Sequence, residues 1–161
     1  MEVRRLDSGL IEMCFPCFAP EEIDNVPLAL KNGLSISPVR YLRNRQAYFA
    51  VYDNEEDVRN VIPDFLVIKQ LAPYDVVVTA RGKDYDCVSR YFWPSSGGDE
   101  DPVTGSAHTG LAPYWAKQHQ KNTLVALQVS KRSGVLYCRM EHDKVYISGS
   151  CVDYLQGHIT V

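Results

Sequence analysis

The sequence predicts an α+β domain in which a mostly antiparallel or mixed sheet wraps around one buried central helix. Two observations favour this fold class. About eight or nine short runs rich in Val, Ile, Tyr and Phe are typical of strands, whereas helical signals are confined to three segments. The third helical segment opens near Thr104 and carries apolar or small residues on most of its faces. A helix of this kind belongs within a sheet rather than on its surface.

The chain is predicted to begin with a hairpin followed by a helix. Ser8-Gly9 lies between two apolar stretches, which indicates a β-hairpin over residues 2–16. Pro20 suits the first turn of a helix, and Asn32-Gly33 is a stop signal, so a short helix is expected between them.

A second short helix is expected among the strands that follow. Asn54 can accept a hydrogen bond from the next turn of backbone, so it is the predicted N-cap of a helix over residues 55–62, which Pro63 ends. Strands are expected on both sides of this helix, at residues 37–44, 46–53, 64–71, 74–82 and 84–93.

The buried helix and three strands complete the chain. Pro113 lies inside the helix that opens near Thr104 and cannot donate to the Thr109 carbonyl, so a kink or a break is expected there. Strands are predicted at residues 123–129, 134–140 and 144–149. In these strands larger apolar residues alternate with other residues, which predicts one buried face.

Composition excludes several classes of function. A chain of 161 residues fits one compact domain. Its net charge of −3 gives no reason to expect a nucleic-acid surface. No apolar run approaches the ~20 residues that span a bilayer, and no signal-type segment follows the N-terminus. We therefore expect a cytoplasmic protein with no nucleic-acid partner and no membrane contact.

The five cysteines are interpreted as reduced thiols of the core. Their number is odd and they are scattered along apolar runs, so a disulfide framework is not expected. Cys14 and Cys17 have the spacing of a metal or redox pair, but no second pair and no nearby histidine completes a zinc site. We therefore expect no metal.

The stretch GGDEDPVTGSAHTG is the candidate functional site. Pro102 pushes Asp101 toward an extended conformation, so Asp101 is expected on the loop side of the helix start. Thr104, Gly105 and Ser106 would present free backbone N–H groups at the positive helix end, which is a pocket for a substrate carboxylate. Asp101 would lie beside the bound molecule and could move a proton to or from it.

Spacing alone leaves other interpretations of these residues open. Acidic residues and a Ser or Thr ahead of a helix commonly stabilise its first turn, where the cap contributes ~1 kcal/mol. His108 lies one turn further on and could contact a ligand, yet a lone helix histidine is more often partly exposed and hydrogen-bonded. Tyr91, Phe92 and Trp115 are expected in the core rather than in a pocket.

The run EDPVTGSAHTGLAPYW resembles the signature of the phenazine biosynthesis PhzF-like family. Eight consecutive positions, from Glu100 to Ala107, match that signature in order. The resemblance continues through SGLIEMCFP, SRYFWP and the closing VYISGSCVDYLQGHITV, so it covers essentially the whole chain. It implies a diaminopimelate epimerase-like fold, in which two pseudosymmetric lobes each enclose a central helix. Residues 1–161 would form the C-terminal lobe alone.

The resemblance also implies a mechanism. PhzF-like proteins are cofactor-independent isomerases that shift a hydrogen on a small carboxylate substrate. Their active-site aspartate and serine correspond to Asp101 and Ser106, and Gly105 and its neighbours correspond to the carboxylate-binding amides. Their principal acid/base, a glutamate, belongs to the other lobe together with a histidine. Those residues lie in stretches of the N-P-A-A and G-H-A-T type, which this sequence does not contain.

Two hypotheses follow for the function of the chain. The first is a PhzF-like isomerase or epimerase present as an incomplete chain and inactive alone, because losing the main base costs on the order of 10²–10⁴-fold in rate. The second is a non-catalytic module that binds small carboxylates or proteins and self-associates through the exposed lobe face. In both, the expected partner is the missing first lobe or a second copy in a homodimer. The final strand, at about residues 152–161, would cross to that partner.

Overall fold

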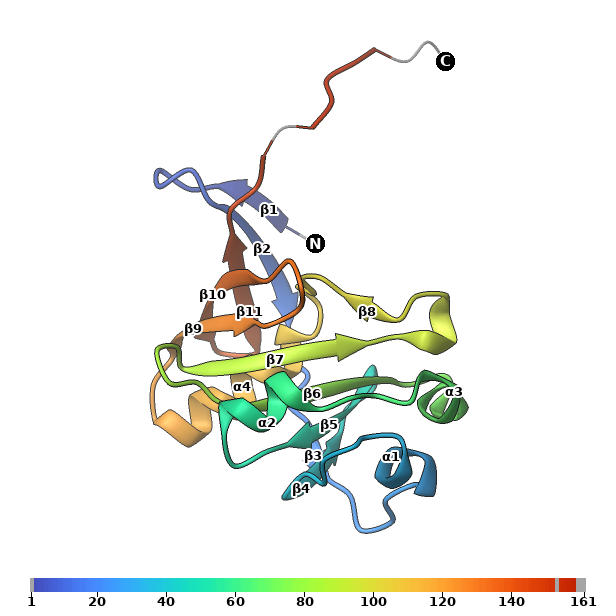
Figure 1. Ribbon diagram of the computed structural model, residues 1–161. Helices are drawn as coiled ribbons and strands as arrows, with labels where there is room; N and C mark the ends of the chain where they lie inside the picture. Colours follow the sequence, from blue (N-terminus) through green and yellow to red (C-terminus); the bar gives the residue numbers. More distant parts are fainter. Residues whose placement is uncertain (1, 153, 159–161) are drawn as a thin grey trace.

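One mixed sheet organises the computed structural model of the protein, which describes residues 2–152 and 154–158 (Figure 1). All neighbouring strands are antiparallel except the pairs β5–β6 and β7–β9, which are parallel. The predicted α+β class with a mixed sheet is therefore confirmed. The strands follow the order β1 (Glu2–Arg5), β2 (Ile11–Pro16), β11 (Lys144–Gly149), β10 (Gly134–Glu141), β9 (Thr123–Gln128), β7 (Cys87–Phe92), β6 (Asp75–Arg81), β5 (Ala47–Val51), β4 (Arg40–Arg43) and β3 (Glu21–Glu22), with β8 (Glu100–Asp101) paired to β7.

The helices are short except for one. They are α1 (Leu28–Asn32), α2 (Glu55–Asn60), α3 (Phe65–Ile68) and α4 (His108–His119), with 3₁₀ turns η1 (Lys69–Leu71) and η2 (Pro94–Ser96). The predicted cap of α2 is confirmed, because the Asn54 side chain accepts the N–H of Asp57 at 2.9 Å. The predicted first hairpin is also confirmed, with Gly9 at a φ of 84° in the turn between β1 and β2.

Two element predictions are wrong. The helix expected to begin at Pro20 begins at Leu28, because Glu21 and Glu22 pair with strand β4 instead. The strand expected at residues 64–71 is helix α3 followed by η1. Asp64 explains this second difference, since its carboxylate accepts the backbone N–H groups of Leu66 and Val67 and so caps a helix start.

Helix α4 continues through Pro113 without a break, contrary to one of the two outcomes expected there. Proline removes the hydrogen bond that the Thr109 carbonyl would accept within the helix. The backbone N–H of Phe18, just after strand β2, donates to that carbonyl at 2.9 Å instead. The segment after β2 therefore replaces the bond that the proline deletes.

The core lies on both faces of the sheet. On one face α4 packs against β9, β10 and β11, and its residues Leu111 and Trp115 join Phe49 and Val77 of the neighbouring strands. On the other face α1, α2 and α3 cover a second cluster of apolar residues, which includes Ala50. Alternate residues of β5 thus face opposite layers, which holds the N-terminal end of α4 at a fixed place relative to β6 and β7.

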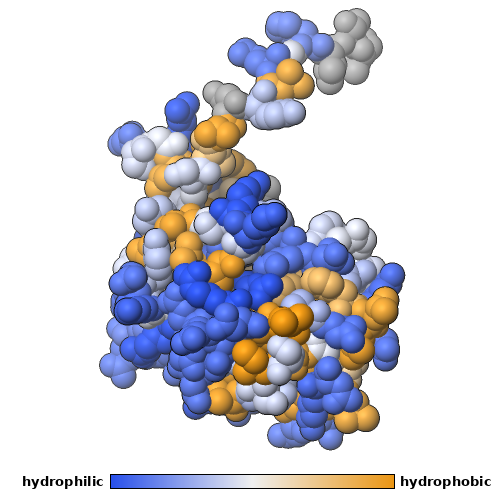
Figure 2. Space-filling model, in the orientation of Figure 1, coloured by the Kyte–Doolittle hydropathy of each residue, from blue (hydrophilic) through white to orange (hydrophobic). Residues whose placement is uncertain are grey.

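Several large apolar side chains are exposed, and two of them, Ile62 and Leu66, line one pocket. Figure 2 shows a largely hydrophilic face with separate apolar areas, and the C-terminal segment extends away from the body in the same view. Val152, Tyr154 and Leu155 of that segment are 90%, 99% and 86% exposed. Within residues 150–152 and 154–158 no strand forms, while residues 153 and 159–161 of the predicted final strand lie outside the described residues. No helix in the described part of the chain is long and apolar enough to cross a bilayer.

The cysteines divide into three groups. Cys87 and Cys138 are buried, as expected of core thiols, and burial raises the pKa of the Cys138 thiol to about 12. Cys14 and Cys17 are only half-buried. Cys151 is exposed, so its placement in the core was wrong.

Candidate functional site

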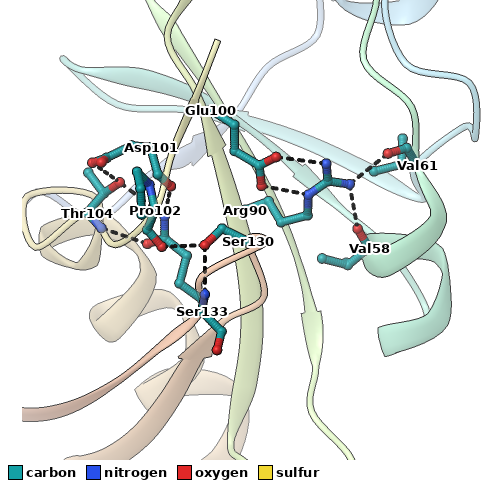
Figure 3. A network of polar contacts seen from close by, with 10 residues as sticks. Val58, Val61, Arg90, Glu100, Asp101, Pro102, Thr104, Ser130 and Ser133 are labelled. Atoms are coloured by element: carbon teal, nitrogen blue, oxygen red, sulfur yellow. Dashed lines mark hydrogen bonds and ion pairs between the residues drawn. The ribbon is translucent and has the colours of Figure 1, made fainter. Parts of the chain in front are cut away.

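Asp101 lies outside helix α4, on the short strand β8. It pairs with Tyr91 of β7, and its carboxylate accepts the hydroxyl of Thr104 at 2.6 Å (Figure 3). The carbonyl of the next residue, Pro102, accepts the Ser130 hydroxyl at 2.6 Å, which braces the loop against the segment after β9. The extended, loop-side position expected for Asp101 is confirmed.

The start of α4 is not capped by the acidic cluster. Its N-cap position is Ala107, no side chain bonds to its first N–H groups, and its first turn holds no acidic residue. A turn over residues 105–107 leads into the helix, with the Gly105 carbonyl accepting the N–H of His108 at 3.0 Å. The helix-cap interpretation of Asp101 is therefore wrong for this helix.

The three acidic residues of the stretch have different surroundings. Glu100 forms a bidentate ion pair with Arg90, at 2.8 and 3.0 Å, and the same guanidinium donates to the carbonyls of Val58 and Val61 at the end of α2 (Figure 3). Asp99 is exposed. Glu100 thus ties the loop to α2, and Asp101 is the carboxylate of this stretch that lies next to the helix start.

Thr104 does not supply the free N–H that was expected of it. Its N–H donates to the Oε1 atom of Gln128 at 2.8 Å, because the buried Gln128 amide on β9 faces this loop. The Nε2 atom of Gln128 donates to the Asp101 carbonyl at 2.7 Å. Gln128 was missed as a site residue, although a polar residue in an otherwise apolar strand is a signal that could have identified it.

The backbone N–H groups of Gly105, Ser106 and Ala107 lie just before helix α4, and Ala107 itself is buried. No hydrogen bond between described residues engages these N–H groups. A Cβ atom added at Gly105 would meet only Met13 Cε, at 3.4 Å, so packing gives little reason for a glycine there. Close approach of a bound molecule to the backbone is a physical reason for a residue without a side chain.

Ser106 connects this backbone to a chain of polar side chains that sequence reasoning missed. The Nε2 atom of Gln46 donates to the Ser106 hydroxyl at 2.9 Å and to the Tyr91 hydroxyl at 2.8 Å. The Tyr91 hydroxyl in turn donates to Oδ2 of Asp75 at 2.5 Å. Burial raises the pKa of Asp75, and burial together with the bond to Asp75 raises the pKa of Tyr91.

A pocket of about 450 Å³ opens beside the hydrogen-bonded side chains of Gln46 and Asp75. It is lined by Phe18, Arg45, Gln46, Pro73 and Asp75. The Arg45 guanidinium lies 4.7 Å from the centre of the Phe18 ring, which places a positive charge at the pocket. The pocket therefore carries a cationic side chain together with the carboxyl group of Asp75.

His108 is fully buried rather than partly exposed. Its Nδ1 atom lies 2.8 Å from the Thr104 carbonyl, and its Nε2 atom has no hydrogen-bond partner among the described residues. Burial lowers the pKa of His108 to about 4, so the ring is neutral at physiological pH. His108 therefore contacts the backbone of the loop at Thr104, whereas the sequence suggested that it could contact a ligand.

The three aromatic residues around the site belong to the core. Tyr91, Phe92 and Trp115 are buried, as expected of core residues, although the Tyr91 hydroxyl reaches the site. No group of three His, Cys, Asp or Glu side chains that could hold a metal ion occurs within residues 2–152 and 154–158.

Comparison with known proteins identifies the family of the chain. The sequence profile of the phenazine biosynthesis-like proteins (PhzC-PhzF) matches residues 2–157. The chain belongs to this family. The resemblance that the signature around Asp101 indicated is therefore confirmed.

Relatives within the PhzC-PhzF family include proteins named isomerases. An uncharacterized isomerase of Pseudomonas aeruginosa is 42% identical over 159 residues, which are 99% of this chain and 60% of that protein. An uncharacterized isomerase of Halalkalibacterium halodurans is 38% identical over 92% of this chain and 57% of its own length. A crystal structure of a PhzC/PhzF protein from Clostridium difficile aligns with a TM-score of 0.86 and 35% identity, covering 99% of this chain and 61% of that chain. The chain therefore spans about three fifths of the length of these relatives.

Proposed function

We propose that this chain acts as one lobe of a cofactor-independent PhzF-like isomerase, in which α4 is the central helix. In this proposal the free amides of residues 105–107 and the Ser106 hydroxyl bind the carboxylate of a small substrate. Asp101 moves a proton to or from the bound molecule. The observation that carries the proposal is the position of Asp101 at the end of strand β8, from which the chain leads into the unpartnered amides that precede helix α4.

The proposed chemistry follows from what each group can do. Backbone N–H groups at a helix start bind anions because they carry the positive end of the helix dipole. Ser106 adds a hydroxyl donor, and Arg45 adds a positive charge at the adjoining pocket. A substrate carboxylate held there would present its neighbouring carbon to Asp101, which can act as general acid or base.

In this proposal a first lobe supplies the second acid/base group. Relatives extend well beyond the length of this chain, and the first-lobe glutamate of the family pattern has no counterpart in this sequence. We infer that the isolated chain binds carboxylates but turns them over little, since one missing acid/base group costs on the order of 10²–10⁴-fold in rate.

Titration of the labelled chain with sodium acetate tests the binding proposal. In a ¹H–¹⁵N correlation spectrum the amides of Gly105, Ser106 and Ala107 should shift and saturate, while amides on the far face of the sheet should not. Absence of a saturable shift at these three amides would overturn the carboxylate site.

Asp101→Asn tests the proton-transfer proposal. The substitution removes the titratable group while keeping an acceptor for the Thr104 hydroxyl. In an assembled protein with a first lobe, turnover should fall by at least 10²-fold. Acetate binding by this chain should persist. Retained turnover would remove Asp101 from the mechanism, and a lower free energy of unfolding without other effect would assign it a structural role.

A second candidate function is a non-catalytic carboxylate-binding or protein-interaction module. The observation that favours it is the exposure of Val152, Tyr154 and Leu155 on a segment that stands away from the body (Figure 1). A homodimer could cover these side chains by exchanging the segments between two copies. Sedimentation equilibrium of the chain and of a variant with Tyr154→Ser and Leu155→Ser tests this. A strict monomer at high concentration argues against it.

A further inference from the structure

Gln46 is held in place from both sides of its backbone. The Asn44 side chain accepts the N–H of Gln46 at 2.8 Å and the N–H of Ala47 at 3.0 Å. The Gln46 carbonyl accepts the N–H of Asp75 at 3.2 Å, at the start of the parallel strand pair β5–β6. The side chain of Gln46 therefore leaves a fixed point at one end of the sheet and reaches Ser106 across the start of α4.

Asp75 sets the direction of the hydrogen bonds that link Ser106, Gln46 and Tyr91 to it. A carboxylate only accepts hydrogen bonds, so at the 2.5 Å contact the Tyr91 hydroxyl must give its single proton to Asp75 Oδ2. A proton taken up on the unpartnered Oδ1 of Asp75 would leave Oδ2 an acceptor and keep this direction. Tyr91 can then only accept from Gln46, which requires the amide NH₂ of Gln46 to face it.

The same amide group then fixes the hydroxyl of Ser106. One N–H of Gln46 Nε2 goes to the Tyr91 oxygen and the other to the Ser106 oxygen, at 2.8 and 2.9 Å. Ser106 accepts in this bond, so its own proton is not used there. A hydroxyl whose acceptor side is occupied offers its donor side to a neighbouring anion, and a bond from a neutral donor to a charged acceptor is among the stronger hydrogen bonds.

We propose that Gln46, oriented by Tyr91 and Asp75, is the positioning residue that makes Ser106 a hydrogen-bond donor to the substrate carboxylate. This inference rests on the proposed function, since it concerns the same carboxylate site. Gln46 also lines the pocket of about 450 Å³, so the group proposed to orient Ser106 can be reached from that pocket.

Acetate titrations of four variants test the proposal through a double-mutant cycle. Ser106→Ala removes the donor, and acetate affinity should fall on the order of tenfold. Gln46→Met removes the NH₂ group at similar size, and affinity should fall several-fold because the hydroxyl loses its fixed orientation. Tyr91→Phe should have a similar but smaller effect, because the Gln46 amide can then rotate. Gln118→Met is the matched control, since Gln118 lies on the exposed face of α4 and should leave affinity unchanged.

The decisive measurement is the effect of Gln46→Met in the Ser106→Ala background. If Gln46 acts through Ser106, the second substitution should change acetate affinity by less than twofold there, whereas a merely structural role would lower affinity equally in both backgrounds. Should Gln46→Met fail to fold, Tyr91→Phe in both backgrounds gives the same answer.

The outcomes separate this inference from the proposed function. If the wild-type chain shows no saturable acetate shift at Gly105 to Ala107, both fall together. If the wild-type chain binds and Gln46→Met and Tyr91→Phe bind equally well, only the positioning role is wrong. Equal losses in the presence and absence of the Ser106 hydroxyl would also overturn it.

Discussion

The backbone N–H of Phe18 donates to the carbonyl of Thr109 at 2.9 Å, at the position where Pro113 interrupts the hydrogen bonds of helix α4. The bond joins the segment that follows strand β2 to the first turn of helix α4. The Phe18 carbonyl also accepts a hydrogen bond from the side-chain amide of Asn44, so both backbone polar groups of Phe18 are hydrogen-bonded. The segment that follows strand β2 thus supplies the hydrogen bond that Pro113 removes from α4.

Pro113→Ala should therefore stabilise the protein very little. Proline inside a helix ordinarily costs ~3 kcal/mol relative to alanine, mainly through a lost hydrogen bond and a steric clash. Since the Thr109 carbonyl already has a donor, the free energy of unfolding in urea should rise by less than about 1 kcal/mol. A gain near 3 kcal/mol would show that the Phe18 bond does not compensate.

Arg90→Met should destabilise the protein by about 2–4 kcal/mol, because it leaves the Glu100 carboxylate and two α2 carbonyls without their donor. Arg90→Lys should recover only part of this loss, since a single ammonium group cannot reproduce the bidentate contact. Urea denaturation of each variant measures these effects. Glu100→Gln is the control for function and should leave the acetate shifts at Ser106 unchanged. Loss of acetate binding in Glu100→Gln would place Glu100 in the site.

The fold was predictable where local chemistry and tertiary packing agree. The hairpin at Gly9 and the cap at Asn54 are decided by the residues themselves, and both were predicted. The segment after Asp64 was mistaken for a strand because its Val and Ile content favours strands, whereas the Asp64 cap decides for a helix. Glu21 and Glu22 have helical propensity, yet pairing with β4 prevails.

The candidate site was predictable only in part. Asp101, Gly105 and Ser106 lie on one continuous stretch, so a signature could identify them. Gln46 and Asp75 are distant in sequence and come together where β5 pairs with β6, and Gln46 then reaches Ser106, which no local pattern reveals. The free N–H predicted for Thr104 failed for the same reason, because its partner Gln128 comes from β9.

Gly105→Ala and Gly110→Ala should have opposite effects on binding and stability. A Cβ atom at Gly110 would lie 2.6 Å from Phe49 Cζ and 2.8 Å from Asn44 Nδ2, so overpacking should cost about 1–3 kcal/mol, against which better helix propensity returns less than about 1 kcal/mol. At Gly105 the only near atom is Met13 Cε at 3.4 Å, so the free energy of unfolding should change by less than about 1 kcal/mol.

Acetate binding distinguishes the two glycine variants further. The methyl group of Gly105→Ala would crowd the amides proposed to bind the carboxylate, so its acetate affinity should fall several-fold although the fold is intact. Gly110→Ala should keep its affinity at temperatures where it is folded. Undiminished binding in Gly105→Ala would contradict the proposed approach of the ligand to this backbone.

His108 should make the protein less stable as the solution is acidified. Burial lowers the folded-state pKa of His108 to about 4, below its ordinary value of 6.5. Between these two pH values the unfolded chain takes up a proton that the folded protein does not. The free energy of unfolding attributable to this residue therefore falls as pH decreases through that window, by at most about 1.4 kcal/mol per pH unit.

Comparison with His108→Asn isolates this effect from that of the carboxylates. The asparagine amide can take the place of Nδ1 and donate to the Thr104 carbonyl, while it does not titrate. Urea denaturation at pH 7.5, 6, 5 and 4.5 should show the variant less stable at the highest pH, because it leaves a cavity, but with a shallower decline toward acid. Parallel declines in the two proteins would mean that His108 does not remain neutral in the folded state.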